Sequence, residues 1–539
     1  MSIKEELQHI IKCSLEKLAI DTSEIEVVID IPKDRKNGDY ASNIALVLAR
    51  SLHKKPMDIA SEIVENIDSE IVSEVKIAEP GFINFKLSYD YVRENLKEIL
   101  REKSNYGRCN IGNNKKIDLE YVSANPTGTL HIGHGRGAVY GDSLARILKF
   151  IGFDVTREYY VNDAGNQMNN LGISIKERYK EVCGLEANIP EDGYHGVEII
   201  EIAKRIYNFY QDSKLEEDVS FFREQGLEIL LTEIKKDLDK FRVNFDVFTS
   251  EQSLYDKRIV DATLTKLQNS GYCYINEDAL WLKTTDYGDE KDRVLIKSDG
   301  NYTYFMPDIA NHIDKYNRGY DKLIDVFGAD HHGYIKRLKG SLEMLGYDSE
   351  KLEVKILQMV RIISDGSELK LSKRPGKTYT LKDLIEDVGI NAARYFFASR
   401  SIDAQMDFDL DLAKAQTNDN PIYYIEYANA RITSILRSYK KEVKSDKFST
   451  MDTDNTYIIL NKLCEFKDIV MTAGLKETPQ LIANYVYELA SLFHSYYGKE
   501  KVITDNCEYT NDRIAMLQAI KIVINNALDL IGIIPREEM

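Results

Sequence analysis

Two histidines and four glycines share one short stretch, TLHIGHGRGAVYGDS at residues 129–143, just before an apolar run. Only Ile132 and Gly133 separate His131 from His134. Such a pair can ligate a metal, lie on the surface without a role, or cradle phosphate groups. The rest of the chain must decide among these three interpretations.

The local pattern around the histidines favours phosphate. Residues 117–122 suit a buried strand, and an apolar face with helical spacing runs from Leu144 to Ile151, so the histidines lie where a strand gives way to a helix. Backbone N–H groups and the helix dipole attract anions at such a position, and imidazoles can donate to the oxygens of a phosphoryl or adenylyl transition state. No third histidine or cysteine lies nearby, which disfavours zinc.

The neighbouring segments predict the sheet that must hold this turn. Gly152 ends the helix, and DVTREYYV alternates as the next strand, which makes half of a doubly wound nucleotide-binding sheet. Strand–helix alternation resumes with DKLIDVFGAD. We therefore predict an α/β, Rossmann-type catalytic domain over residues 111–400, with a helix-rich, motif-poor insertion at about 170–290.

Two further domains are expected, because 539 residues are too many for one compact core. Residues 1–110 mix helical periods with short alternating strands, which predicts a small α+β module. Residues 401–539 have a helical pattern throughout, which predicts a terminal helix bundle.

Composition limits the partners and the compartment. The formal net charge of −17 means that any RNA must be met by local basic patches. Six cysteines are scattered without a C-x-x-C pair, so we expect reduced thiols and no zinc ribbon or disulfide framework. The chain shows neither a membrane-spanning run nor a signal peptide at its start, and we expect a cytoplasmic protein.

A second, basic stretch, LKLSKRPGK, lies far downstream of the histidines. Alone it fits a solvated loop. Together, HIGH at 131–134 and KLSKR at 370–374 resemble the two signatures of class I aminoacyl-tRNA synthetases, of which the second reads K-M-S-K-S in that family. Leu371 and Arg374 are mild departures from that pattern. The resemblance implies triphosphate chemistry, in which positive charge closes on the departing pyrophosphate.

The resemblance also assigns roles. The catalytic residues that it implies are His131, His134, Lys370 and Lys373. The ATP-binding residues that it implies are Thr129, Gly133, Gly135 and Ser372.

Further stretches resemble the arginyl-tRNA synthetase branch in particular and extend the resemblance over essentially the whole chain. They are EYVSANPTGTLHIGH, YYVNDAGNQM, YTYFMPDIANH, FGADHHGYIKRL, NPIYYIEYANARI and LDLIGIIPREEM. The resemblance implies ligation of L-arginine to tRNA(Arg) through an arginyl-adenylate, with MgATP as co-substrate and tRNA bound before arginine is activated. It further implies a monomer without structural zinc.

The residues themselves agree with a cationic substrate, because a guanidinium favours planar carboxylates and an aromatic wall. Glu120 ends the first predicted strand, and Asn125 lies in the turn after it. Tyr304 and Asp308 share one face if a helix starts there. We predict that Asp308 and Glu120 bind the guanidinium and that Tyr304 contacts it. Asn125 would hold the α-amino group, and His332 would line the pocket.

Each of these assignments has a plain alternative. Among 88 acidic residues a single carboxylate is most often a surface charge, Asp308 can simply cap a helix, and Tyr304 can belong to the core. Asp163 ends the second strand, where open sheets place ligands. The DHH run at 330–332 could suggest a metal, but we interpret it as pocket lining.

For tRNA, the resemblance implies that the helical C-terminal domain holds the anticodon end and the N-terminal module the elbow. The residues predicted to contact RNA are Tyr423, Tyr424, Tyr427 and Arg431. Some of these aromatic rings can stack on unpaired bases, but their spacing also suits core packing, which we favour for at least one of them.

Two rival functions remain open at this point. A small-molecule nucleotidyltransferase could use the same histidine turn, but it would need neither the N-terminal module nor the long helical C-terminal region. A non-catalytic RNA-binding relative would have no need of both histidines and both loop lysines, all of which the chain retains.

Overall fold

The computed structural model describes residues 2–32, 34–329, 333–369, 372–374, 377–441, 443 and 447–539, with the backbone alone for 372–374, 377 and 378. The chain forms two compact units. One comprises residues 110–416 and 531–533, and the other residues 1–109, 417–530 and 534–539. None of the described helices is long and apolar enough to cross a lipid bilayer.

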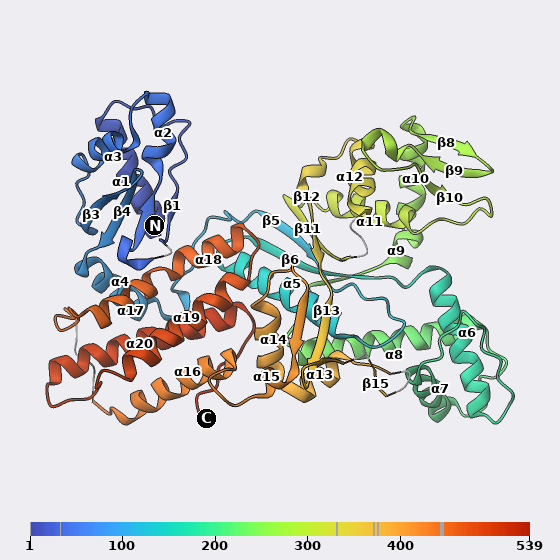
Figure 1. Cartoon of the computed structure of the whole chain (residues 1–539). Coiled ribbons are helices and arrows are strands. Elements are labelled where there is room, and N and C mark those ends of the chain that lie inside the picture. Colours follow the sequence, from blue (N-terminus) through green and yellow to red (C-terminus); the bar gives the residue numbers. More distant parts are fainter. Residues whose placement is uncertain are drawn as a thin grey trace. The chain divides into compact units, whose positions relative to one another are not determined.

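A five-stranded sheet with the order β12-β11-β5-β6-β7 lies at the centre of the first unit (Figure 1). Its strands are β5 (Lys116–Glu120), β6 (Asp154–Val161), β7 (Val247–Ser250), β11 (Lys322–Gly328) and β12 (Leu352–Leu357). All four pairings are parallel, and the chain winds from β5 to β6 and β7 before it returns on the other side as β11 and β12. The predicted doubly wound α/β fold is confirmed, and its winding reverses at β5, where such sheets bind ligands.

Helix α5 (Ile132–Phe150) follows β5 and carries the glycines of the histidine turn. The strand predicted over 117–122 ends at Glu120, because Val122 and Ser123 have φ values of 69° and 37°, which no strand can continue. The helix then lies close to Tyr121, since a Cβ added at Gly141 would fall 2.2 Å from a carbon of its ring. The strand predicted after Gly152 is β6.

The segment expected as a helix-rich insertion contains α6 (Gly165–Val182), α7 (Val197–Tyr210) and α8 (Val219–Lys240). These helices share their own apolar core. The same segment also supplies β7 of the central sheet and part of a small antiparallel sheet. The elements after α8, apart from β7, are α9 (Glu251–Asp256), α10 (Ile259–Asn269), β8 (Cys273–Asn276), β9 (Ala279–Leu282) and β10 (Arg293–Ile296). With four residues, β7 is too short to show a strand period in the sequence.

The rest of the first unit surrounds the sheet. Its helices are α11 (Phe305–Asn317), α12 (Tyr334–Met344), α13 (Leu381–Val388), α14 (Ile390–Ala398) and α15 (Leu410–Lys414). Its short strands are β13 (Val360–Ser364), β14 (Ser367–Glu368), β15 (Ser372–Arg374), β16 (Lys377–Thr378) and β17 (Met406–Asp409). The expectation that the chain is wholly helical from residue 401 is wrong for β17, which pairs in parallel with β13.

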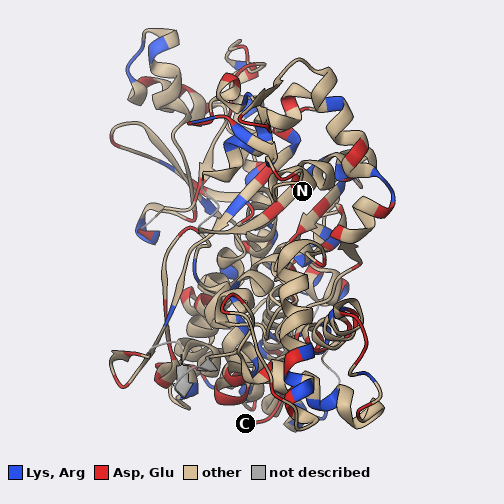
Figure 2. Cartoon of the chain, turned by 90° about the vertical axis from the view of Figure 1, so that its right-hand side faces the viewer, with Lys and Arg blue, Asp and Glu red and all other residues tan. Residues whose placement is uncertain are grey.

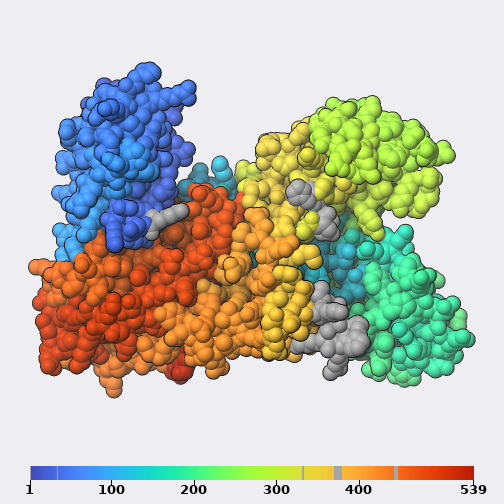
Figure 3. Space-filling view, in the orientation of Figure 1, coloured from blue at the N-terminus to red at the C-terminus, as the bar shows by residue number. Residues whose placement is uncertain are grey.

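The second unit joins the N-terminal module to the helix bundle, as the blue and red surfaces of Figure 3 show. The module has the antiparallel sheet β1-β2-β4-β3. Its elements are α1 (Ile3–Lys17), β1 (Ile29–Asp30), β2 (Tyr40–Ser42), α2 (Ile44–Leu52), α3 (Pro56–Glu65), β3 (Val72–Ala78), β4 (Phe82–Leu87) and α4 (Tyr89–Glu102). The bundle consists of α16 (Pro421–Ser438), α17 (Asp454–Cys464), α18 (Phe466–Leu475), α19 (Gln480–Tyr497) and α20 (Cys507–Leu530).

Candidate active site

The two histidines cap helix α5 reciprocally. His131 is the N-cap residue, and its Nδ1 accepts hydrogen bonds from the backbone N–H of Gly133 (3.1 Å) and His134 (3.4 Å). Nδ1 of His134 accepts one from the backbone N–H of His131 (3.3 Å). From the sequence we expect the backbone N–H groups at this helix start to bind a phosphate. In this structure those of Gly133 and His134 are hydrogen-bonded to His131 instead.

Capping also fixes the chemistry of the two rings. Since each Nδ1 accepts, the proton of each neutral ring lies on Nε2. The rings stack with centroids 3.6 Å apart. Desolvation lowers the pKa of His131, and desolvation together with His131 lowers the pKa of His134 to about 3. The turn thus presents two neutral imidazoles, each with one Nε2–H donor.

The structure also places the other predicted nucleotide-binding residues. Gly135 faces α13, and a Cβ added there would lie 2.8 Å from a methyl carbon of Leu381. Gly128 and Thr129 line a small pocket against α7 and α8. Lys370 lies outside the described residues. Ser372 and Lys373 belong to β15, which pairs antiparallel with β16.

Acidic residues gather near the carboxyl ends of the parallel strands. Glu120 is the last residue of β5, and Asp163 follows the end of β6. Asp163 accepts hydrogen bonds from Ser250 Oγ (2.7 Å) and the backbone N–H of Gln252 (2.9 Å). Asp308 lies in the first turn of α11, where the helix dipole favours a carboxylate. These three carboxylates are the candidates for the acidic side of a site for a cation.

The predicted arginine-binding residues have different surroundings. Glu120 is buried and accepts hydrogen bonds from Lys315 Nζ (2.5 Å) and Ser123 Oγ (2.9 Å). Asp308 accepts one from the Tyr334 hydroxyl. Tyr304 is the N-cap residue of α11 and is 59% exposed. Its exposure leaves the ring accessible to a substrate.

Asn125 and His332 complete the predicted set. The side-chain amide of Asn125 donates to Gln167 Oε1 at 3.1 Å. His332 lies outside the described residues.

Glu251 is an acidic residue of this region that the sequence analysis misses. It is the first residue of α9, directly after β7, and it is 4% exposed. The Tyr160 hydroxyl donates to its carboxylate at 3.1 Å. Burial, followed by the charge of Asp308, raises the pKa of Glu251 to about 7. Asp163 follows a strand that the sequence predicts, whereas Glu251 follows the four-residue strand β7, which carries no period, so the sequence holds no comparable signal for Glu251.

Arg136 anchors the segment that carries the 370–374 stretch. It follows the histidines on α5, is 2% exposed, and donates to the carbonyls of Gln358 (2.8 Å), Ser401 (2.6 Å) and Ala404 (2.7 Å). Beyond the 370–374 stretch, His131 forms an isolated antiparallel bridge with Thr380. Both sides of the basic stretch are therefore tied to the start of α5.

The tyrosines predicted to contact RNA lie on α16 and are half-buried. Tyr424 packs on His494, with ring centroids 4.2 Å apart, as expected for a structural aromatic. Tyr423 and Tyr427 stack at 6.4 Å. The Arg431 guanidinium lies 4.3 Å from the centroid of the Tyr427 ring. Tyr423, Tyr427 and Arg431 form an aromatic–cationic surface on α16.

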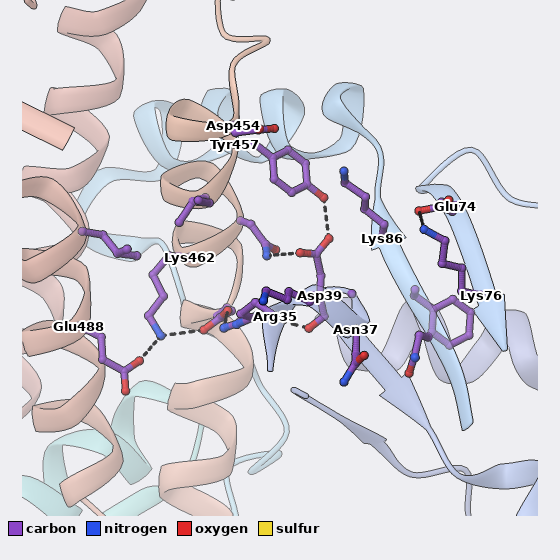
Figure 4. Close-up of a pocket in the computed structure, with 18 of the residues that line it drawn as sticks. Arg35, Asn37, Asp39, Glu74, Lys76, Lys86, Asp454, Tyr457, Lys462 and Glu488 are labelled. Atoms are coloured by element: carbon purple, nitrogen blue, oxygen red, sulfur yellow. Dashed lines mark hydrogen bonds and ion pairs between the residues drawn. The ribbon is translucent and has the colours of Figure 1, made fainter. Parts of the chain in front are cut away.

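The second unit holds a pocket of about 810 Å³ between the N-terminal module and helices α17 and α19, here called the module–bundle pocket (Figure 4). At its base, Asp39 is 7% exposed and accepts hydrogen bonds from the Tyr457 hydroxyl (2.6 Å) and the Asn461 amide (2.7 Å). Lys462 bridges Glu465 and Glu488 at 2.8 and 2.5 Å.

The walls of the module–bundle pocket are polar and mixed in charge. Five basic and five acidic side chains line it, together with amides and aromatic rings. Lys86 lies 5.4 Å from the centroid of the Tyr457 ring, and Lys76 pairs with Glu74 at 2.9 Å. Figure 2 shows the same interspersion of acidic and basic residues along the wider chain.

Family models match nearly the whole chain. The model described as "tRNA synthetases class I (R), catalytic domain" matches residues 95–433. Those described as "Arginyl tRNA synthetase N terminal domain" and "DALR anticodon binding domain" match residues 5–87 and 425–539. The parallel sheet, the histidine turn and these matches define the class of protein as a class I aminoacyl-tRNA synthetase.

Individual relatives identify the amino acid. The arginine–tRNA ligase of Listeria monocytogenes is 48% identical over 545 residues, which cover 99% of this chain and 98% of that one. The arginine–tRNA ligase of Bacillus subtilis is 47% identical over 556 residues, covering all of both chains. The Thermus thermophilus arginyl-tRNA synthetase structure has the same fold, with a TM-score of 0.79 at 20% identity over all of both chains. The chain belongs to the arginyl-tRNA synthetase family, and it joins arginine to tRNA(Arg) with ATP.

Proposed function

We propose that arginine is activated at the carboxyl edge of the sheet and then transferred to tRNA. The carboxylate of arginine attacks the α-phosphate of MgATP, which forms arginyl-adenylate and releases pyrophosphate. The terminal ribose hydroxyl of tRNA then takes the arginyl group and releases AMP. The observation that carries this proposal is the pair of neutral, Nε2–H-bearing histidines at the start of α5, on the edge where the acidic residues gather.

Asp308 and Glu251 bind the guanidinium in this proposal, with Glu120 beside them and Tyr304 as the aromatic wall. Support comes from the charge of the region, since burial and the charge of Asp308 disfavour the ionised form of Glu251, which a bound cation would favour. A guanidinium supplies that charge and can donate to two carboxylates at once. Asn125, together with Asp163 after the end of β6, would hold the α-amino group of arginine.

The triphosphate is held from two sides. The Nε2–H groups of His131 and His134 donate to phosphate oxygens, and Lys370 and Lys373 neutralise the leaving pyrophosphate. We propose that Mg²⁺ arrives with the triphosphate, because no group of three or more His, Cys, Asp or Glu among the described residues could hold a metal ion. No structural zinc is part of the proposal.

For tRNA, we propose that the module–bundle pocket holds an unpaired nucleotide of the elbow and that α16 contacts the anticodon end. Amides can pair with a base edge, aromatic rings can stack on it, and lysines can meet the backbone. Tyr423, Tyr427 and Arg431 offer the same chemistry on α16. We propose that the protein acts as a monomer in the cytoplasm. The free thiols of all six cysteines support the compartment, because the cytosol keeps thiols reduced.

ATP–pyrophosphate exchange tests the proposal. We expect exchange only when arginine and tRNA are both present. His134→Ala should lower kcat by about 10²- to 10³-fold, as loss of a transition-state donor does, with little change in the KM for arginine. Lys373→Ala should abolish adenylate formation and retain tRNA binding by filter assay. Exchange without tRNA, or full activity in Lys373→Ala, would contradict the corresponding part of the proposal.

A further inference from the structure

A group of buried charges lies behind the acidic site, between the sheet and α11. Its acidic members are on three neighbouring strands, and its basic members are spaced three residues apart on α11 and at its end. The members of this α11 charge network are Asp118, Glu120, Glu158, Asp325, His312, Lys315 and Arg318.

Strand register explains why the four carboxylates face one side. Glu120 pairs with Asp325 on β11 and with Glu158 on β6, so these three lie in one row across the sheet. Asp118 lies two residues before Glu120 on the same strand and therefore points to the same face. α11 meets that row with its own stripe of charges.

Lys315 ties two of the strands to the helix. It is fully buried, and its Nζ donates to Glu120 at 2.5 Å and to Asp325 at 2.8 Å. Arg318 makes a two-pronged ion pair with Glu158, at 2.7 and 3.1 Å. These pairings fix the orientation of Glu120, which we propose to lie beside the guanidinium.

His312 is held between two acceptors. Its Nδ1 lies 2.7 Å from the carbonyl oxygen of Asp308, and its Nε2 lies 2.7 Å from a carboxylate oxygen of Asp325. A carbonyl and an ionised carboxylate accept but do not donate, so both ring nitrogens must carry protons. Burial alone would lower the pKa of His312, but Asp325 outweighs it and the pKa is raised.

The charges cancel if one carboxyl group is protonated. Asp118 is the candidate, because neither of its oxygens has a hydrogen-bond partner among the described residues and Lys315 Nζ is 3.6 Å away. Burial raises the pKa of Asp118 to about 8. Among these members, Asp325, Glu120 and Glu158 then balance His312, Lys315 and Arg318. The partly exposed Asp314 of α11 adds a further carboxylate, 3.3 Å from Arg318 Nε.

We propose that His312 as an imidazolium, together with Lys315, positions Asp308 and Glu120 for the guanidinium of arginine. His312 holds the first turn of α11 through the Asp308 carbonyl, and Lys315 holds Glu120 from the same helix. The groups that face this pair are Asp118 and Glu120 from β5, Glu158 from β6 and Asp325 from β11. Near Asp308 they are joined by Glu251 from α9 and Tyr334 from α12. The inference rests on the arginine-binding roles proposed above.

Kinetics provide the first test, with matched asparagine substitutions on adjacent strands. Asp325→Asn removes an acceptor of both cations, and His312→Gln removes the imidazolium. Each should raise the KM for arginine by about tenfold or more, with kcat and the KM for ATP within about threefold. Asp118→Asn replaces a neutral carboxyl group by a neutral amide and should change the KM for arginine by less than about twofold. Equal effects of Asp118→Asn and Asp325→Asn would overturn the proposal.

Nuclear magnetic resonance provides a second test that needs no variant to fold. At pH 8 an ordinary histidine, with a pKa near 6.5, is neutral. In ¹⁵N-histidine-labelled wild-type protein, one of the nine histidines should show the imidazolium signature at that pH, and His312→Gln should remove that signal. Nine neutral histidines would overturn the proposal even if the variants do not fold.

Asp308→Asn separates this inference from the proposed function. If Asp308→Asn leaves the KM for arginine unchanged, the proposed arginine site is wrong. If Asp308→Asn raises that KM but His312→Gln and Asp325→Asn do not, only the positioning role of the network is wrong.

Discussion

At the scale of single residues, the site combines groups whose protonation is set by burial rather than by bulk pH. His131 and His134 are kept neutral, so that they donate without adding charge. The pKa of Glu251 is raised to about 7, because burial and the charge of Asp308 both disfavour its ionised form. The shift of Glu251 predicts a pH dependence of arginine binding.

The KM for arginine should depend on the ionisation of Glu251. With a pKa of about 7, Glu251 is mostly protonated at pH 6 and mostly ionised at pH 8, and only the ionised form attracts the guanidinium fully. The KM for arginine should therefore fall by up to about tenfold over this range. Glu251→Gln should raise the KM at pH 8 and remove the pH dependence. Steady-state exchange at several pH values measures both effects.

A surface acid supplies the control for Glu251. Glu233 pairs with Arg205 on the insertion helices, and both side chains are more than 40% exposed. Glu233→Gln should leave the KM for arginine and its pH dependence as in wild type. A pH dependence that survives in Glu251→Gln would assign the titration to another group.

At the scale of elements, α5 does more than present the histidines. Through Arg136 it holds the backbone before β13, and through His131 and Thr380 it holds the chain before α13. A guanidinium that serves three carbonyls cannot be replaced by an ammonium with the same geometry. The start of α5 and the basic stretch should therefore be disturbed together when Arg136 changes.

Arg136→Met should destabilise the first unit and slow adenylate formation. It removes the donor that the carbonyls of Gln358, Ser401 and Ala404 share, and because these carbonyls are only partly shielded from water we take about 0.5–1.5 kcal/mol for each hydrogen bond. We expect a loss of about 3 kcal/mol in the free energy of unfolding by urea, and a lower kcat in exchange at temperatures where the protein is folded. Arg136→Lys should lower the free energy of unfolding by less than Arg136→Met does. Arg205→Met, at an exposed ion pair, should change stability by less than about 0.5 kcal/mol.

The elements around the histidines could be predicted, because β6 and α5 each carry a clear period in the sequence. The α11 charge network could not. His312 and Lys315 look like polar positions of any helix, and only the pairing of β5 with β11 brings Glu120 and Asp325 together. Glu251 follows a strand of four residues that shows no period. Long-range strand register, rather than local pattern, decides these parts of the site.

At the scale of the whole molecule, an acidic chain must bind a polyanion. With a formal net charge of −17, long-range attraction to tRNA is weak, and affinity depends on lysines whose charge is not already cancelled nearby. The module–bundle pocket contains a matched pair for this comparison. Lys76 is neutralised by Glu74 at 2.9 Å, whereas Lys86 lies over the Tyr457 ring.

Lys86→Gln should therefore weaken tRNA binding more than Lys76→Gln does. A lysine that meets a phosphate contributes about one unit to the slope of log affinity against log salt. We expect Lys86→Gln to lower that slope by about one and Lys76→Gln to leave it nearly unchanged, as measured by filter binding between about 50 and 200 mM salt. Neither variant should alter thermal unfolding by more than a surface substitution does. Slopes equal to that of wild type in both variants would mean that the pocket lysines do not face the RNA backbone, and the elbow would then have to bind elsewhere on the N-terminal module.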